Sequence, residues 1–371
     1  MYTKRQFFFL LKVFISVITI SFSSLYSWID LEKELMADFI IENKKIKIPG
    51  YPDAFNPSIM RWKGSLLMSF RTGDFNLASD SEEEPYSLLM SFRIRDPLDA
   101  LTNEIGLVLM DQDFNIISTP QVLYVPRKDP HLAFRQQDPR LIAVKDKIYL
   151  VFCNMIEGFQ VPEIRRMFIT ELHYDGRYFY VDEPECLAHF DGENESRWQK
   201  NWVPFDYKGQ LMLSYSIMPH RVVCPIIGTG ACPTFDYTNA KSDWQWGVLR
   251  GGTPALQVDG EYLSFFHSSL VIPTEQSQGK KIQHYFMGAY TFASKPPFHI
   301  TKISPQPIVG EKFYNGPAHQ TWKPLRVVFP AGFIFDDKFV WVAYGRQDHE
   351  IWISKMDKQG LMNSLLPVSS Q

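Results

Sequence analysis

"RQQDPRLIAVKDKIYLVFCN", residues Arg135–Asn154, is the stretch that decides the fold. An aspartate, a proline and an arginine come directly before an apolar run, the letters KDK mark a turn, and a second apolar run follows. Two β-rich runs separated by turn residues are a β-hairpin signal. Proline fits the first residue of a strand, because no ladder hydrogen bond to its nitrogen is needed there. The stretch therefore predicts a hairpin with a polar head.

The same form recurs along the chain. Relatives of the stretch are "NPSIMRWKGSLLMSFR" (56–71), "NWVPFDYKGQLMLSYS" (201–216), "GTPALQVDGEYLSFFHS" (252–268) and "FPAGFIFDDKFVWVAYG" (329–345). The five copies lie about 50 to 80 residues apart, which leaves room for a four-stranded unit each time. Helical periodicity is nearly absent after residue 40. The repeat predicts an all-β chain with a five-bladed β-propeller over residues 45–360, and a pair of β-sandwiches is the alternative.

The N-terminal residues 1–28 have a different character. Lys4 and Arg5 precede an apolar run over 7–22, and small residues follow. This order is typical of a secretory signal peptide. Lys12 interrupts the run, so an uncleaved membrane anchor is a second reading, and a buried helix of a cytosolic protein is a third. The segment favours an exported or membrane-anchored protein over a cytoplasmic one, with the membrane as a partner through this segment.

Composition narrows the classes of function. The net charge is -3 and the 38 basic residues are spread along the chain, so nothing favours nucleic acid as a partner. Aromatic residues make up 15%, which suits a strand-rich core and also carbohydrate surfaces. The sequence holds no C-x-x-C pair and no His/Cys cluster, so we expect no metal and no cofactor. Cys224 and Cys232 lie close enough in sequence to form a disulfide if the chain is exported.

A propeller would bring the polar heads together. Equivalent strand starts point to the same end of the central channel, so the heads and the ends of the second strands would ring one mouth. A polar mouth lined by aromatic strands is typical of a sugar site. The residues expected there are Asn56, Asp138, Arg140, Lys200, Asn201 and Thr253 from the heads, and Arg71, Asn154, His220, His267, Arg346 and Asp348 from the strand ends.

Asp138 is the candidate proton donor. Cleavage of a glycosidic bond requires a proton on the leaving oxygen, and a positioned carboxyl can supply it. The alternative is that Asp138 caps the turn and pairs with Arg140 or Arg135. Glycosidases normally use two carboxylates. The heads at Asn56 and Asn201 are not acidic, so Asp53 and Asp348 are the candidates for the second one.

A set of cations accompanies this acid. Its members could hold phosphate or a nucleotide-sugar diphosphate through charge-assisted hydrogen bonds. The alternative is that some neutralise nearby aspartates and the rest face solvent. The set consists of Lys200, Arg71, Arg140, Arg346 and the pair Arg165 and Arg166. Lone histidines such as His220 and His267 are more often buried strand residues than ligands.

These motifs resemble, in order, glycoside hydrolase family 130, the β-mannoside phosphorylases and hydrolases. The resemblance rests on "NPSI", "QDPRL", "KNW", "RGGTPAL", "YFMGAYTF" and the run over 327–354, and covers about residues 50–355. It implies a five-bladed propeller that acts on β-mannosides. It also implies that Asp138 donates the proton, relayed through a sugar hydroxyl in the phosphorylases, and that Lys200 binds phosphate. Arg165 and Arg166 align with no position of the family's motif, and Arg166 is the one expected to bind phosphate with Lys200. Gln137 replaces the family's common acid, and "GRQD" replaces "GAAD".

Three classes of function follow. An exported enzyme would gain little from a sugar phosphate, so the first hypothesis is a glycosidase-type enzyme acting on β-mannosides or related β-glycosides, with a carbohydrate as its substrate. The second is a mannoside phosphorylase, with inorganic phosphate as a partner, or a mannosyltransferase. The third is a non-catalytic carbohydrate-binding propeller.

Overall fold

The computed structural model describes residues 28–73, 103–126, 133–158, 161–193, 198–316 and 324–370. The N-terminal hydrophobic segment, read above as a signal peptide or membrane anchor, lies outside the described residues apart from Trp28. In the described part, no helix is long and apolar enough to cross a membrane.

Strands dominate the described chain and form several sheets that are mostly antiparallel. The first contains β2 (Phe55–Trp62), β3 (Ser65–Gly73), β4 (Asn103–Met110) and β5 (Gln121–Val122). The second contains β6 (Ala133–Val144), β7 (Lys147–Gly158), β8 (Val161–Tyr174), β9 (Phe179–Val181) and β10 (Glu185–Cys186). The third contains β11 (Val203–Tyr207), β12 (Gln210–Ser216), β13 (His220–Val223) and β14 (Thr234–Thr238).

The second half of the chain continues this pattern. One sheet contains β16 (Arg250–Gly251), β17 (Leu256–Val258), β18 (Glu261–Ile272), β19 (Ile282–Ala293), β20 (Ile300–Ile303), β21 (Leu325–Arg326) and β25 (Leu366–Pro367). Another contains β22 (Val328–Phe335), β23 (Phe339–Arg346), β24 (Glu350–Asp357) and β1 (Ile40–Ile46). The remaining elements are short: β15 (Ala240–Lys241), β26 (Ser369–Ser370), α2 (Leu31–Glu34) and α3 (Lys358–Ser364).

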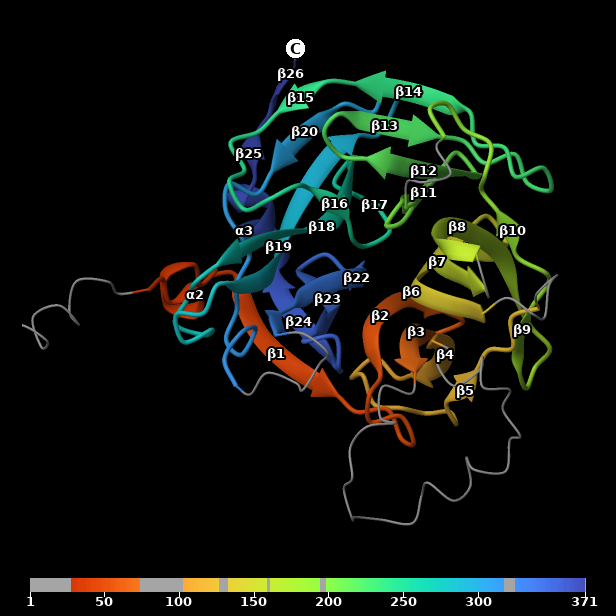
Figure 1. The fold of residues 1–371 in the computed structure, drawn as a ribbon, viewed down its shortest axis with the longest axis horizontal. Helices are drawn as coiled ribbons and strands as arrows, with labels where there is room; N and C mark the ends of the chain where they lie inside the picture. The colour runs from red at the N-terminus through yellow and green to blue at the C-terminus, as the bar shows by residue number, and fades with distance from the viewer. Residues whose placement is uncertain are drawn as a thin grey trace, which may run out of the picture.

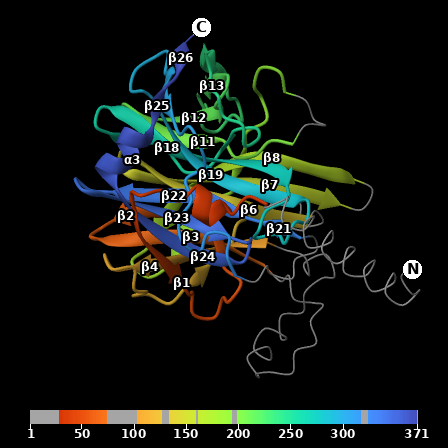
Figure 2. The same ribbon diagram turned by 90° about the vertical axis from the view of Figure 1, so that its left-hand side faces the viewer.

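The sheets are arranged around a centre, as Figure 1 shows, so the all-β prediction and the propeller arrangement are confirmed. Viewed from the side, the long strands β7 and β8 project beyond their neighbours (Figure 2). The sequence predicts five blades, whereas four blades have main strands that follow one another along the chain, beginning with β2, β6, β11 and β16. The remaining large sheet takes its outer strand β1 from the N-terminal end. The hairpin predicted over 329–345 is formed there by β22 and β23, and the pairing of β1 with β24 from the other end of the chain leaves no local sequence pattern.

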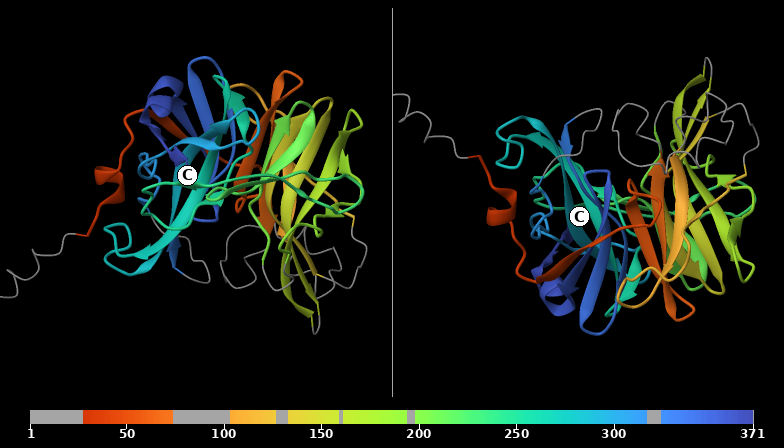
Figure 3. Two further views of the ribbon diagram at one scale, coloured as in Figure 1. Left: turned by 90° about the horizontal axis from the view of Figure 1, so that it is seen from above. Right: turned by 90° about the horizontal axis from the view of Figure 1, so that it is seen from below.

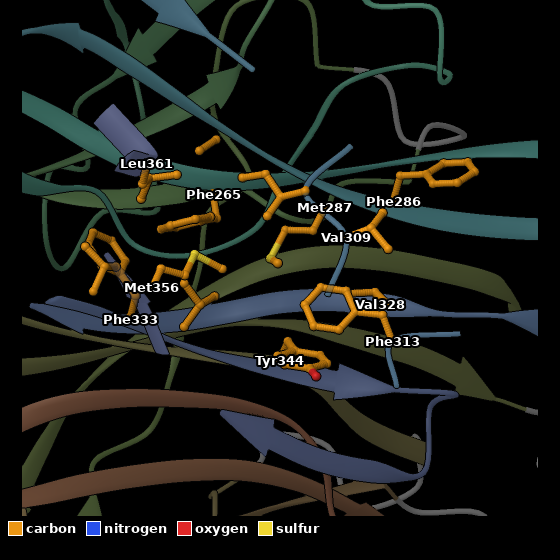
Figure 4. Close-up of a cluster of buried hydrophobic side chains, with 14 of the residues drawn as sticks. Phe265, Phe286, Met287, Val309, Phe313, Val328, Phe333, Tyr344, Met356 and Leu361 are labelled. Carbon is orange, nitrogen blue, oxygen red and sulfur yellow. The ribbon is translucent and has the colours of Figure 1, made fainter. Parts of the chain in front are cut away.

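Neighbouring sheets pack through apolar side chains. Figure 4 shows one such cluster, in which Phe265 and Met287 from β18 and β19 meet Phe333, Tyr344 and Met356 from β22, β23 and β24. These side chains are buried. Alternation along each strand sends every second residue into such an interface, which is what the apolar runs of the repeats encode.

The cysteines are all free thiols, so the disulfide considered for Cys224 and Cys232 is not formed. The Cys224 nitrogen donates to the Pro233 oxygen at 3.0 Å. This register sets Cys232 opposite Pro225, so the two thiols leave the ladder on opposite faces. Accordingly, Cys224 and Cys232 lie in different hydrophobic clusters.

Candidate active site

Three of the predicted heads share an unusual backbone conformation. Asn56, Asp138 and Asn201 have φ of 47°, 52° and 64°, and all three are buried. Asparagine and aspartate enter this left-handed region at lower cost than other residues with a Cβ. The backbone therefore accounts for a small polar residue at each head. It does not account for a carboxylate at Asp138, where an asparagine would serve the backbone equally well.

The Asp138 carboxylate is held between the first two blades. The Asn56 amide Nδ2 donates a hydrogen bond of 2.8 Å to Asp138 Oδ1, and Arg71 Nη1 lies 3.5 Å from the same oxygen. The carboxylate is thus fixed by a neutral donor and flanked by a cation, which selects one orientation of the acid.

Arg140 ties this acid to two further blades. Its Nη1 donates to the Asp138 main-chain oxygen at 2.9 Å, and its Nη2 donates to Asn201 Oδ1 at 3.1 Å. Its Nε donates to the Gly252 oxygen at 2.5 Å. Burial lowers the pKa of Arg140 to about 10, which leaves the side chain charged at neutral pH. Through these hydrogen bonds, Arg140 links the backbone at Asp138 to the third and fourth blades.

The charges around Asp138 decide its ionisation. Burial by itself would raise the pKa of the carboxyl, but Arg71, Lys200 and Arg140, together with the Asn56 hydrogen bond, outweigh burial and hold that pKa below its usual value. Burial also lowers the pKa of Lys200, and the field of Asp138 opposes this change. In the free protein at neutral pH, the carboxylate is ionised and lies among an excess of cations.

Two aromatic groups complete the surroundings of the acid. His267 is buried, its Nδ1 donates to the Gly251 oxygen at 3.0 Å, and burial together with the charges of Lys200 and Arg140 lowers its pKa to about 3. His267 is therefore neutral at physiological pH. Burial, followed by the charge of Asp348, raises the pKa of Tyr285, and Asp138 acts in the same direction. Sequence reasoning predicted His267 and Asp348 but missed Tyr285.

Arg165 and Arg166 lie on opposite faces of β8, and Arg165 is the one on the face of Gln137 and Cys153. Arg165 Nη1 donates to Gln137 Oε1 at 3.3 Å, and the charge of Arg165 acts on Lys200 and Cys153. Its guanidinium lies 4.1 Å from the ring centroid of Trp198. Arg166 projects from the other face of β8, because successive residues of a strand alternate. It donates to the Arg165 main-chain oxygen and lies 4.0 Å from Glu193.

Two other predicted ligands lie elsewhere and are held by structural hydrogen bonds. His220 packs against Phe292, its Nδ1 donates to the Phe298 oxygen at 2.6 Å, and burial lowers its pKa to about 4. Arg346 donates to Glu350 Oε2 at 2.8 Å and to the Phe313 oxygen at 3.2 Å. Asp53, considered as a second carboxylate, lies 3.3 Å from His349 Nδ1. Within the described ranges, no group of His, Cys, Asp or Glu side chains is arranged to hold a metal ion.

The site depends on a close approach between the first and last inner hairpins. A Cβ on Gly345 would overlap the Asn56 amide oxygen and lie 2.9 Å from the Asn56 nitrogen. We expect Gly345→Ala to displace Asn56 from Asp138 and to lower stability by about 1–3 kcal/mol, the usual cost of overpacking. Chemical denaturation checks this, and an unchanged midpoint would show that Asn56 has room to move.

Several solved structures share the fold of this chain. A β-1,2-mannobiose phosphorylase from Listeria innocua aligns with TM-score 0.54 and 14% identity, covering 91% of this chain and 98% of the other. MPT-4, a mannose phosphorylase from Leishmania mexicana in complex with a phosphate ion, aligns with TM-score 0.55 and 12% identity, covering 89% and 92%. A structure of the GH130 family of mannoside phosphorylases, which contains hydrolases that target β-1,2-mannosidic linkages in Candida mannan, aligns with TM-score 0.52 and 13% identity, covering 90% and 94%.

The chain has a fold like that of glycoside hydrolase family 130. The resemblance read from the ordered motifs is thereby confirmed at the level of the fold. The sequence matches no family model and no curated protein. At identities of 12–14% the likeness concerns the fold alone, so the chemistry has to be argued from the residues around Asp138.

Proposed function

We propose that the chain cleaves β-mannosidic bonds and that Asp138 donates the proton to the leaving oxygen, directly or through a neighbouring sugar hydroxyl. The observation that carries the proposal is the carboxylate itself. It occupies a buried left-handed head where the backbone would accept asparagine, and it is oriented by Asn56 and Arg71. The class of substrate is suggested by the structural neighbours, several of which act on mannosides.

The ionisation of Asp138 indicates which molecule accepts the mannosyl group. A carboxylate among cations is a weak proton donor until some of their charge is offset. An anionic acceptor bound near Lys200 and Arg165 would offset it and raise the pKa of Asp138 toward that of a working acid. This charge balance supports phosphorolysis as the second candidate, with inorganic phosphate in place of water. Transfer of mannose from a nucleotide sugar is a further alternative.

Product analysis separates these reactions. The protein is incubated with β-1,4- and β-1,2-mannobiose, with and without inorganic phosphate. Free mannose alone in both conditions indicates hydrolysis, and a sugar phosphate formed only when phosphate is present indicates phosphorolysis. Product formed only with GDP-mannose indicates transfer. Mannoside binding without turnover under any of these conditions would contradict the proposal and indicate a sugar-binding propeller.

The lowered pKa of Asp138 gives a prediction for pH dependence. Activity requires the protonated carboxyl, whose fraction falls as pH rises above its pKa, so kcat/KM should fall with increasing pH. Arg71 is the cation that lowers this pKa most. We therefore expect Arg71→Met to raise the pKa and to move the falling limb of the pH profile to higher pH. The profile of kcat/KM against pH is the measurement.

The control for this prediction is Arg61→Met. Arg61 belongs to the same blade, is exposed, and donates to Gln112 rather than to Asp138. It should leave the limb where it is. If kcat/KM of Arg71→Met falls over the same pH range as that of the wild type, Asp138 does not set the pH profile.

Two structural expectations remain proposals. We infer that the sheet of β22–β24 and β1 serves as the fifth blade and closes the ring of residues 45–360, because its inner hairpin repeats the pattern of the other four. We also infer export or membrane anchoring from residues 1–28. Fractionation of cells expressing the full chain tests this location, and recovery of the unprocessed protein in the cytosol would contradict it.

A further inference from the structure

A row of buried polar side chains crosses the second blade beside the acid. Gln136 pairs with Asn154, and Asn154 pairs with Arg166, so the three lie next to one another on one face of β6, β7 and β8. Asn154 is 0% exposed, and Gln136 and Arg166 are each 7% exposed. Both polar atoms of Asn154, and Gln136 Oε1, have no hydrogen-bond partner. The row begins two residues before Asp138.

This face points toward the first blade. Phe152 and Phe168 lie on the same face as Asn154 and pack in one hydrophobic cluster with Leu67 of β3. Ser69 and Arg71 follow Leu67 at intervals of two, so they share its direction. Ser69 is 0% exposed and its Oγ has no partner, and Arg71 reaches Asp138. Figure 1 shows β3 and β7 in adjacent blades. Unpartnered polar atoms therefore lie on the facing sides of two adjacent blades, and Arg71, on the same side of β3 as Ser69, reaches the acid.

Such a cluster is costly to the protein by itself. A buried polar group without a partner costs roughly 1–3 kcal/mol, and natural proteins contain few of them. The two amide atoms of Asn154, Gln136 Oε1 and Ser69 Oγ are hidden from solvent and have no protein partner, so they are free to bind a molecule that reaches them.

The chemistry of the cluster limits the kind of molecule. The Asn154 amide offers a donor and an acceptor, Gln136 offers an acceptor, and Ser69 offers a hydroxyl that serves as either. An anion would satisfy only the donors, and a cation would satisfy only the acceptors. Hydroxyl groups both donate and accept, so several hydroxyls on one ring match the set.

We propose that Asn154, Gln136 and Ser69 form a subsite that binds hydroxyl groups of the sugar ring whose bond is cleaved at Asp138. This inference rests on the proposed function and adds residues that determine specificity for the sugar. Asn154 is the central member, because it lies between Gln136 and Arg166 and has two unpartnered atoms.

The test compares stability and binding in one variant. Asn154→Leu keeps the shape of the side chain and removes both unpartnered atoms. Since no protein hydrogen bond is lost, we expect its thermal midpoint to equal or exceed that of its parent. We expect the dissociation constants for β-1,2- and β-1,4-mannobiose, measured by calorimetry, to rise about tenfold or more, the equivalent of one or two hydrogen bonds. Both measurements use Asp138→Asn as the parent, so that turnover does not interfere.

Tyr344→Phe is the matched control. Tyr344 is also buried with an unpartnered hydroxyl, but it lies in the hydrophobic cluster of Figure 4 and away from the row. It should leave mannobiose binding unchanged. If Asn154→Leu binds both sugars as tightly as its parent, the cluster holds only water and the inference is wrong.

Other outcomes are also decisive. If Asn154→Leu does not fold, Ser69→Ala takes its place with the same expectation and the same contradicting result. A parent that binds neither disaccharide refutes the proposed mannoside substrate rather than the role of Asn154 alone. Binding that depends on Asn154 without turnover in the wild-type protein supports the subsite and refutes the proposed catalysis.

Discussion

Asp138→Asn should abolish nearly all turnover of mannobiose while leaving the protein folded. General acid catalysis contributes about 10²–10⁴-fold to rate, so we expect kcat/KM to fall by that factor. Asparagine tolerates the φ of 52° at this position, as it does at Asn56 and Asn201, and its amide oxygen can still accept from Asn56. The thermal midpoint should therefore stay close to that of the wild type. Steady-state kinetics and thermal unfolding check the two halves of this prediction.

Asp259→Asn is a matched control for this variant. Asp259 also has a left-handed backbone, with φ of 50°, but it is exposed in the turn between β17 and β18 and pairs with Lys358. The Asp259→Asn variant should have the same kcat/KM as the wild type. If Asp138→Asn kept full turnover, the acid would have to be another residue, and Asp138 would be a backbone residue like Asn56.

Glu32→Ala should produce the largest loss of stability. Glu32 is 4% exposed, and its carboxylate accepts hydrogen bonds from the backbone nitrogens of Lys312, Tyr314 and Asn315 at 3.0, 2.6 and 2.7 Å. The Asn315 amide donates a fourth, at 2.7 Å. The glutamate thus joins α2, which lies outside the ring of sheets in Figure 1 and is the red helix in Figure 3, to the loop after β20. Its removal leaves buried N–H groups unpaired, and we expect a loss of about 3 kcal/mol or more.

Chemical denaturation measures this loss, and Glu34→Ala is the control. Glu34 lies in the same short helix but is exposed and accepts only from the Asp30 nitrogen at 3.3 Å. Its removal should change stability by less than about 0.5 kcal/mol. A loss in Glu32→Ala no greater than that in Glu34→Ala would mean that α2 does not hold the loop in solution.

The inner hairpins could be predicted because their signals are local. The opening stretch forms β6 and β7, with the turn at Lys145 in the left-handed region, and each relative of that stretch forms a hairpin too. The outer strands are short or irregular, and β1 pairs with β24 from the other end of the chain. Neither feature leaves a periodic pattern, so the sequence repeat predicts the inner strands of the propeller better than its outer strands.

The site was predictable where a residue type itself carried the information. A proline after an aspartate or asparagine identified the heads at Asn56 and Asp138. For His220 and Arg346, sequence gives the position of the side chain along a strand but not that main-chain oxygens already accept hydrogen bonds from it.

The remaining differences between prediction and structure concern the face of the strand on which a side chain lies. Arg165 and Arg166 leave β8 on opposite faces, and bulges such as the one between Gln137 and Arg140 shift which residues of the neighbouring strand share each face. Tyr285 was missed because nothing in its local sequence separates it from the other strand aromatics.

The most direct test of the central claim is the structure of the Asp138→Asn variant with bound β-1,2- or β-1,4-mannobiose. We expect the side chain at this position to lie within about 2.6–3.2 Å of the bridging oxygen or of a hydroxyl of the adjacent sugar. A disaccharide bound outside the mouth formed by Asn56, Arg71 and Lys200, or held with its bridging oxygen beyond reach of position 138, would contradict the assignment of Asp138 as the proton donor.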